Sequence, residues 1–480
     1  MKNKIFNREI CVCALLATNS ICAKSSAEME KTMKRNWIGM MMAAALTLGL
    51  TACGGSPAND SAGDNPDNAG AANTDADTVT ADGKVKITAY LGGEMPDENQ
   101  KLIEAFNAQS DTTEVEMLTL TKGSSGYQML TVMYNAGNPP TVYFLESGDV
   151  MKLTDKLANL SDLDCMNYAA AGTTEDVTVD GTVYGVPANL QAYGLIYSRQ
   201  VLSDVMGEDF DPSSIKTRED LEEVFKQIEA QGIAPVAISP FDWNLGNHWF
   251  CQIYTGQAAD AAGRDAFIGE LKAGTADLAG NTVFQDYMDT FDLLMKYNYY
   301  KDNPLETAAD GNEKQAQLLA TGQAAFWFHG NWAAHNIRTL DEEGEYGFIP
   351  VPVSESNPNA GKICTLVPGY FTVEQSTTTE EQQQAGKEFI DWIISSQEGQ
   401  QYVINCGNVP AYSNNTATIT ESISQSVVDY TTTGNNFPMY VMYPSDHYTN
   451  VGASMQRYLS GEIDRETMAA EIEAYWATQQ

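Results

Sequence analysis

The chain has 480 residues, with 27 lysines and arginines against 64 aspartates and glutamates, and its formal net charge is −37. A field of this sign repels nucleic acid and anionic lipid headgroups and keeps a protein soluble, so we expect no nucleic-acid partner. The length is sufficient for two or three domains, each with a core of its own.

The beginning of the chain has the pattern of a secretory signal. Lys34 and Arg35 precede an apolar stretch at 38–50, which is shorter than the roughly 20 residues that span a bilayer. Small residues follow, in the order typical of a cleavable signal peptide. The run Leu-Thr-Ala before Cys53 resembles the lipobox of bacterial lipoproteins, which implies cleavage there and a lipid on Cys53. The alternative is an ordinary signal peptide with a chance cysteine.

Two segments therefore precede the folded part of the chain. Residues 1–52 are predicted to be a signal region, in which the true translation start is Met29 or Met33, because the residues before them do not fit the signal. Residues 53–83 are rich in Gly, Ala, Asn, Asp, Ser and Thr. They cannot bury enough apolar surface to offset their ordering entropy, so we expect a flexible linker anchored by the lipid.

Strands and helices alternate after the linker. Apolar and polar residues alternate from 85 to 91, which predicts a strand, and a helix follows at 97–109. A second strand begins at Val115, a second helix surrounds Leu130, and 141–145 is a third, fully apolar strand. This order predicts a parallel sheet with helices on its faces.

The alternation continues through the middle of the chain. Thr217 and Asp220 form a capping box that opens a helix. Short apolar strands are predicted at 234–239 and 324–328, and helical spacing of apolar residues prevails towards the end of the chain.

Four groups of segments carry a resemblance to a known family. The first group is VYGVP (183–187) with GLIYSR (194–199), and the second is GQAAF (322–326) with GNW (330–332). The third is GYF (369–371), and the fourth is FIDWI (389–393) with EGQQ (398–401). Each is weak alone, but the ordered set resembles the extracellular solute-binding proteins of ABC importers, in the carbohydrate-binding group. Ser198 and Phe326 depart from the asparagine and methionine that are usual in the family.

The resemblance implies an α/β, two-lobed periplasmic-binding-protein-like fold of the class II type. Each lobe would be a mixed, mostly parallel sheet flanked by helices, and crossing hinge segments would join the lobes. We expect an N-terminal lobe from 84–190 plus 330–368, and a C-terminal lobe from 191–329 plus 369–480.

The implied function is that of a lipid-anchored substrate-binding component of an ABC transporter. It would capture a mono- or oligosaccharide in the cleft between the lobes and deliver it to the permease transmembrane subunits. The alternative is the same fold and role with a polyamine, a peptide or another non-sugar solute. The implied location is the extracellular face of the cell membrane, or the periplasmic side in a Gram-negative envelope, with the lipid as the only membrane contact. We expect a monomer.

No enzyme, metal or cofactor site is predicted. Glu146 and Asp149 have the spacing of a glycoside-hydrolase acid and nucleophile, but paired carboxylates also bind hydroxyl groups without chemistry. The four histidines are too scattered for a metal site: His248, His329, His335 and His447. The cysteines of the body form no CxxC pair, and the sequence assigns no disulfide among them: Cys165, Cys251, Cys364 and Cys406.

The predicted ligand-binding residues follow from the chemistry of sugars. Aromatic rings stack on apolar sugar faces, and carboxylates and amides bind the hydroxyl groups. Residues 241–250 combine these types after a predicted strand, and Asp242, Trp243 and Trp249 lead the candidates, although Trp249 could instead begin a core helix. The resemblance adds Trp332 and Tyr370. The remaining candidates, from loops, helix starts and the first crossover, are Glu94, Tyr127, Glu146, Asp149, Gln191, Tyr193, Asn247, His329 and Asn331.

Overall fold

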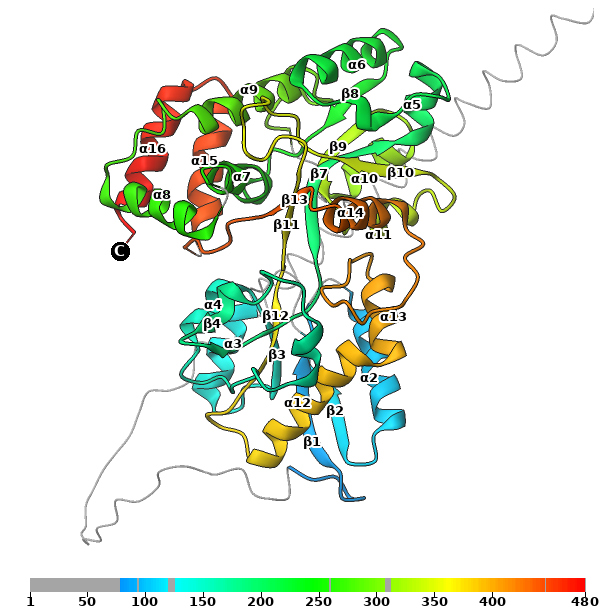
Figure 1. The fold of residues 1–480 in the computed structure, drawn as a ribbon, viewed down its shortest axis with the longest axis vertical. Helices are drawn as coiled ribbons and strands as arrows, with labels where there is room; N and C mark the ends of the chain where they lie inside the picture. The colour runs from blue at the N-terminus through cyan, green and yellow to red at the C-terminus, as the bar shows by residue number, and fades with distance from the viewer. Residues whose placement is uncertain are drawn as a thin grey trace, which may run out of the picture. The chain divides into compact units, whose positions relative to one another are not determined.

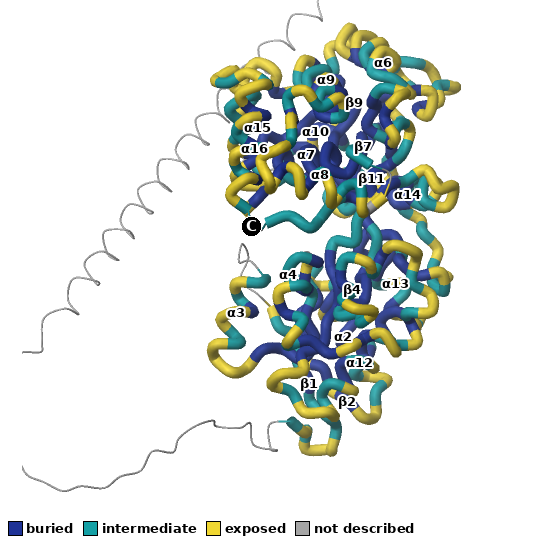
Figure 2. Tube along the Cα trace, turned by 60° about the vertical axis from the view of Figure 1, so that its left-hand side comes forward, coloured by how far each residue is buried: buried dark blue, intermediate teal, exposed yellow. Residues whose placement is uncertain are grey.

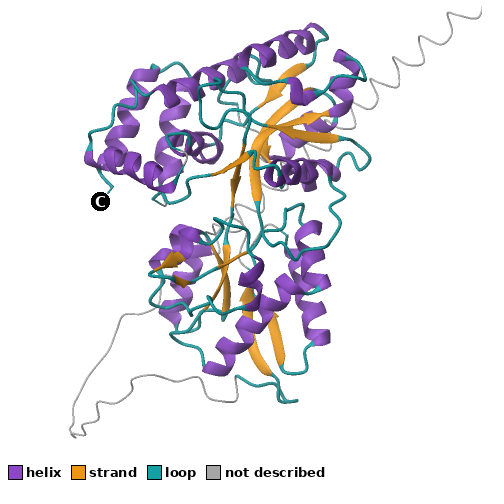
Figure 3. Ribbon diagram, viewed as in Figure 1, coloured by secondary structure: helices purple, strands orange, loops and turns teal. Residues whose placement is uncertain are grey.

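The structure is a computed structural model in which two sheets, each flanked by helices, form two lobes (Figures 1 and 3). This confirms the predicted two-lobed α/β fold. The signal region and residues 53–77 of the linker lie outside the described residues. The structure describes residues 78–92, 95–119, 126–258, 260–306, 312–444 and 446–479.

The first lobe is built on a five-stranded sheet with the order β2-β1-β3-β12-β6. β1 pairs in parallel with β2 and β3, and β12 pairs antiparallel with β3 and β6, so the sheet is mixed as expected. A separate hairpin joins β4 (Thr178–Val179) to β5 (Thr182–Val183). The sheet strands are β1 (Val85–Tyr90), β2 (Thr113–Met117), β3 (Val142–Leu145), β6 (Val186–Pro187) and β12 (Tyr370–Val373).

Apolar faces of two helices close the core of the first lobe. The rings of Phe106 and Phe389 meet edge to face with centroids 4.8 Å apart, and both are buried. The predicted helix at 97–109 is confirmed. The helices are α2 (Pro96–Gln109), α3 (Gly126–Ala136), α4 (Ser147–Lys152), α12 (Glu380–Ser395) and α13 (Gln397–Asn405), with short 3-10 turns η2 (Asp164–Tyr168) and η3 (Glu175–Val177).

The second lobe is built on a sheet with the order β13-β11-β7-β9-β8, and β10 pairs with the far end of β7. β7 is the longest strand and is antiparallel to β9, β10 and β11. The strands predicted at 234–239 and 324–328 are β8 and β9. The strands are β7 (Gln191–Ser198), β8 (Ala234–Ala237), β9 (Ala324–Gly330), β10 (Tyr346–Ile349), β11 (Ile363–Leu366) and β13 (Asn436–Pro438).

Helices cover both faces of this second sheet, and buried residues gather between them and the strands (Figure 2). The predicted capping box of Thr217 and Asp220 is present at the start of α6. A π-helical segment, η5 (Trp243–Trp249), leads into α7. The helices are α5 (Arg199–Met206), α6 (Arg218–Ala230), α7 (Phe250–Thr255), α8 (Ala261–Ala273), α9 (Thr282–Lys296), α10 (Asn312–Ala320), α11 (Ala333–Arg338), α14 (Ser422–Thr432), α15 (His447–Leu459) and α16 (Arg465–Ala477), with a 3-10 turn η4 (Pro212–Ser214).

The strand pairing corrects the predicted lobe boundaries. β10 and β11 pair with β7, so the expectation that 330–368 belongs to the first lobe is wrong. β12 pairs with β3, and α12 packs against the first sheet, so the part of 369–480 that contains them belongs to the first lobe. The motifs show that the chain crosses between lobes, but they do not show which sheet each strand joins.

Hydrogen bonds tie the crossing segments together at the hinge. Leu190 and Val409 exchange backbone hydrogen bonds of 2.7 and 3.1 Å. The amide of Asn331 adds two more, because its oxygen accepts from the N–H of Ala192 at 2.8 Å and its nitrogen donates to the carbonyl of Gly407 at 2.9 Å. The hinge therefore holds the ends of both sheets close together.

Two further features concern cysteine chemistry and the membrane. The four described cysteines are buried free thiols, so they form no disulfide with one another. Within the ranges that the structure describes, no helix combines the length and the apolar character needed to cross a bilayer.

Candidate functional site

A cavity of about 410 Å³ lies between the two lobes, beside the hinge. Its volume is within the usual range for small-molecule sites. A larger hollow of about 780 Å³ opens between α11 and α13, but its lining includes three glutamates, Glu342, Glu343 and Glu345, and none of the candidate residues. The cavity between the lobes is therefore the candidate site.

Five rings from the second lobe form one wall of this cavity, here called the aromatic box. Tyr193 comes from β7, Trp243 and His248 from η5, His329 from the end of β9, and Trp332 from the turn before α11. Measured between ring centroids, Trp332 lies 5.1 Å from Tyr193, 5.6 Å from His248 and 5.0 Å from His329. Trp243 lies 5.0 Å from His248. Each ring thus supports its neighbours.

η5 is a π-helical segment, and two of its residues five positions apart, Trp243 and His248, line the cavity. Such segments are rare and are frequent at functional sites. The carboxylate of Asp242 accepts a hydrogen bond from the N–H of Trp243 at 2.8 Å, and the amide of Asn244 donates to the carbonyl of Ser239 at 2.8 Å. A Cβ atom on Gly246 would lie 2.4 Å from the carbonyl oxygen of Tyr448, so only glycine lets α15 pack this closely against the segment.

The two histidines of the box are uncharged near neutral pH. Burial, with a smaller effect of the neighbouring His329, holds the pKa of His248 well below its ordinary value. Burial alone lowers the pKa of His329 to about 3. Within the described part of the chain, His248 Nδ1 and His329 Nε2 have no hydrogen-bond partner.

The wall formed by the first lobe and the hinge combines polar and apolar side chains. Glu146, after β3, is the only charged side chain among the described lining residues. Asn99 donates to the carbonyl of Gly92 at 2.9 Å and accepts from the hydroxyl of Tyr402 at 2.7 Å. Amides and apolar side chains rather than charges therefore make up most of this wall.

The structure brings half of the predicted ligand-binding residues together at the cavity. They come from both lobes and from the hinge. The residues that line it are Glu146, Gln191, Tyr193, Trp243, Asn247, His329 and Trp332.

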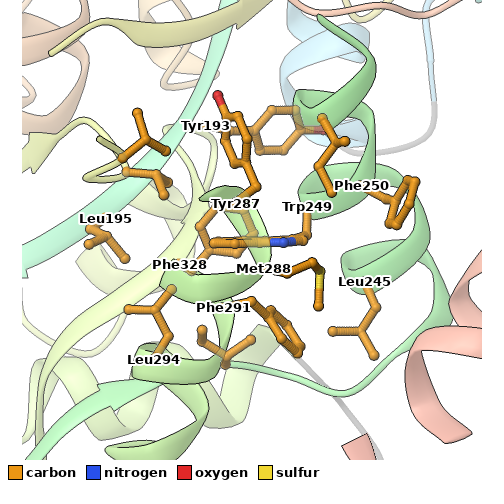
Figure 4. Close-up of a cluster of buried hydrophobic side chains, with 14 of the residues drawn as sticks. Tyr193, Leu195, Leu245, Trp249, Phe250, Tyr287, Met288, Phe291, Leu294 and Phe328 are labelled. Atoms are coloured by element: carbon orange, nitrogen blue, oxygen red, sulfur yellow. The ribbon is translucent and has the colours of Figure 1, made fainter. Parts of the chain in front are cut away.

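Three other candidates lie in the interior instead. Trp249 is 1% exposed, and its ring packs on Phe291 and Phe328 in the core of the second lobe (Figure 4), as the alternative interpretation had it. Tyr370 is buried in the first lobe and does not line this cavity. Asn331 is buried, and its amide is committed to the hinge.

The remaining candidates are engaged elsewhere or cannot be placed. Asp242 caps its own helix, and Asp149 pairs with Lys152 at 2.9 Å. The ring of Tyr127 lies beneath the ammonium group of Lys152, 4.8 Å from its centroid. None of the three lines the cavity. Glu94 lies outside the described residues.

Several residues that line the cavity are not among the predicted ligand-binding residues. His248 stands within the run 241–250 and could have been chosen by its position there. Asn408 lies at the hinge after α13, and Asn99 begins the second turn of α2. Tyr443 carries no sequence signal, because only the fold brings its segment to the cavity.

Comparisons with known proteins agree with this architecture. The family profile described as bacterial extracellular solute-binding protein matches residues 92–400. An uncharacterised ABC transporter extracellular-binding protein of Pyrococcus horikoshii is 27% identical over 248 residues, which are 48% of this chain and 52% of that protein. The chain thus matches about half the length of this curated relative.

Solved structures show the same fold at low sequence identity. A chitin oligosaccharide binding protein has a TM-score of 0.65 and 19% identity, over 81% of this chain and 98% of that one. A solute-binding protein in complex with raffinose has a TM-score of 0.66 and 16% identity, over 82% and 99%. A maltose-bound protein of T. maritima has a TM-score of 0.62 and 19% identity, over 82% and 98%.

Proposed function

The chain belongs to the bacterial extracellular solute-binding proteins, and we propose that it captures a mono- or oligosaccharide in the cavity between its lobes for an ABC transporter. The aromatic box is the observation that carries this proposal. Rings such as Trp243 and Trp332 offer flat apolar faces to a sugar ring, and the amides of the opposite wall offer partners for hydroxyl groups. The chitin oligosaccharide, raffinose and maltose named for the structural relatives support the same ligand class.

The lining chemistry argues against a polyamine. Each ammonium group of a polyamine needs a carboxylate or a comparable acceptor, since an unpaired buried charge is costly. Although the whole chain has a net charge of −37, the described lining has one carboxylate, that of Glu146. An uncharged solute fits this wall better than a cation with several charges.

The cellular setting is part of the same proposal. The signal region, Cys53 as the site of lipid attachment and the linker would hold the protein at the outer face of the membrane. The lobes would close around the sugar, because a ligand favours the state that it binds better. A permease would then receive the loaded protein, which would act as a monomer.

A thermal-shift screen of the full chain tests the ligand class. A ligand that binds only the folded state raises the melting temperature by mass action. We expect a shift with one class of mono- or oligosaccharide and none with spermidine or short peptides. Trp243→Ala should abolish the shift, whereas Trp249→Phe, six residues away in the core, should lower the melting temperature and keep the shift. A clear shift with spermidine or a peptide alone would overturn the proposed ligand.

A further inference from the structure

We propose that His248 and His329 are specificity-determining residues of the cavity, whose unpartnered ring nitrogens bind hydroxyl groups of an uncharged solute. This inference rests on the proposed function. The residues come from different elements, η5 and β9, and their ring centroids lie 5.6 Å apart. Both line the cavity.

Two other polar side chains near the box are committed within the protein, whereas the side-chain oxygen of Asn189, in the hinge, is a further unpartnered atom of the described lining. The side-chain oxygen of Asn247 accepts from the hydroxyl of Tyr443 at 2.8 Å. The side-chain nitrogen of Gln191 donates to the side-chain oxygen of Asn408 at 3.0 Å. By contrast, His248 Nδ1 and His329 Nε2 are buried and without a partner in the described structure. These two nitrogens are therefore unpaired, and each exposes less than 1 Å² of surface in this structure.

The packing of the two rings holds these nitrogens in place. His329 is 1% exposed and stacks on Trp327, with centroids 4.5 Å apart and planes at 6°. His248 is 8% exposed and packs against Tyr193 at 4.5 Å and Trp243 at 5.0 Å. Since neighbouring rings hold both imidazoles, neither can turn towards another partner without breaking the box. A buried polar group without a hydrogen-bond partner raises the free energy of the unbound protein. A ligand that pairs with this group removes that penalty and therefore binds more tightly.

The chemistry of a neutral imidazole selects the kind of ligand group. One ring nitrogen carries a proton and donates, and the other accepts. A hydroxyl group both donates and accepts, so it can pair with His248 Nδ1 and His329 Nε2 in either tautomer. An ammonium group only donates and brings a charge that no neutral ring offsets. A solute without the hydroxyl would leave the nitrogen unpaired, which is how polar sites reject such analogues.

Two substitutions at each histidine distinguish the hydrogen bond of the ring nitrogen from the packing of the ring. In His248→Asn the amide replaces the group at Nδ1, and in His329→Gln the amide replaces the group at Nε2, whereas His248→Phe and His329→Phe keep only a ring. By titration calorimetry with the sugar that gives the largest thermal shift, each phenylalanine variant should bind roughly 5- to 150-fold more weakly. The amide variants should recover most of that loss. His335→Gln, which changes an exposed histidine outside the cavity, should bind as the wild type does.

A test on the ligand side does not depend on how the variants fold. Monodeoxy analogues of the same sugar are titrated against the wild-type protein, and at least one should bind at least tenfold more weakly. That loss should disappear in one of the two phenylalanine variants. If no analogue binds more weakly, or if both phenylalanine variants bind as the wild type does, the inference is overturned while the proposed function stands. If the wild type binds no sugar at all, the proposed function fails, and this inference fails with it.

Discussion

The two walls of the cavity differ in chemistry and in the way they are held. The second-lobe wall is a box of five rings that pack on one another, and it includes two neutral histidines. The first-lobe wall has one carboxylate, Glu146, and amides such as Asn99. The second-lobe wall therefore offers a preformed aromatic surface, whereas the first-lobe wall offers amides and the one described charge beside apolar side chains such as Phe144. A sugar can use both walls, because its ring faces are apolar and its edges carry hydroxyl groups that form hydrogen bonds.

The lobes also differ in their response to acid, and here we expect the largest effect. All four histidines of the chain lie in the second lobe, and burial holds the pKa of three of them well below its ordinary value. The folded state thus binds fewer protons than the unfolded state, so stability is full above about pH 6.5 and is lost as the pH falls towards 3. Each such group adds at most about 1.4 kcal/mol per pH unit to the loss of stability below pH 6.

Thermal unfolding between pH 7 and pH 4 measures this slope, and pulsed hydrogen exchange shows which lobe opens first. We expect protection to be lost first in β7 and β9 of the second lobe, while β1 and α12 of the first lobe stay protected. His447→Asn removes one of the three buried histidines and should reduce the slope by about a third. A melting temperature that stays constant from pH 7 to pH 5 would contradict the prediction.

Loss of a ring from the box should weaken binding more than any change in the opposite wall. Trp332→Ala removes a ring that touches three others, and a buried aromatic anchor contributes about 2 to 3 kcal/mol, which is roughly 30- to 150-fold in affinity. Titration calorimetry with the best sugar measures the loss. Trp392→Phe on α12 of the first lobe is the control, and it should leave the affinity unchanged.

Neutralising the first-lobe carboxylate should have a smaller effect. Glu146→Gln keeps the shape and a neutral acceptor, and a hydrogen bond to a charged group exceeds a neutral one by about 1 kcal/mol, so we expect an affinity loss of roughly fivefold. The measurement is the same titration. An increase in affinity, or a loss larger than that of Trp332→Ala, would show that the two walls do not divide the contacts in this way.

Asp149→Asn gives the smallest expected effect. Its carboxylate pairs with Lys152 on the surface of α4 and does not line the cavity. Exposed ion pairs contribute little to stability, so both the affinity and the melting temperature should stay close to those of the wild type. A tenfold loss of sugar affinity would show that this side of α4 reaches the ligand.

The fold and the family were predictable because their signals are local and ordered along the chain. Alternation of apolar residues at 85–91 and helical spacing at 97–109 gave β1 and α2 close to their observed bounds. The ordered motifs gave the family, and the match over residues 92–400 confirms that prediction. Which sheet β11 and β12 join was not predictable, because pairing between distant strands leaves no local pattern.

The site was only partly predictable, because side-chain direction depends on local geometry and distant packing. Trp243 lines the cavity and Trp249 packs in the core, and no pattern in the run 241–250 indicates which of the two faces the ligand. Tyr370 is the middle residue of the GYF motif, but it is packed inside the first lobe. A Cβ atom added to Gly185 would lie 2.7 Å from the Cβ atom of Tyr370. Tyr443 reaches the cavity only through the fold of the second lobe.

A crystal structure of the full chain with the sugar that gives the largest thermal shift would show whether the cavity between the lobes is the binding site. The prediction is a sugar in the cavity between the lobes, with a ring face on Trp243 or Trp332 and a hydroxyl group within about 3.2 Å of His248 Nδ1 or His329 Nε2. A sugar bound outside this cavity, or one held there without contact to the aromatic box, would contradict it.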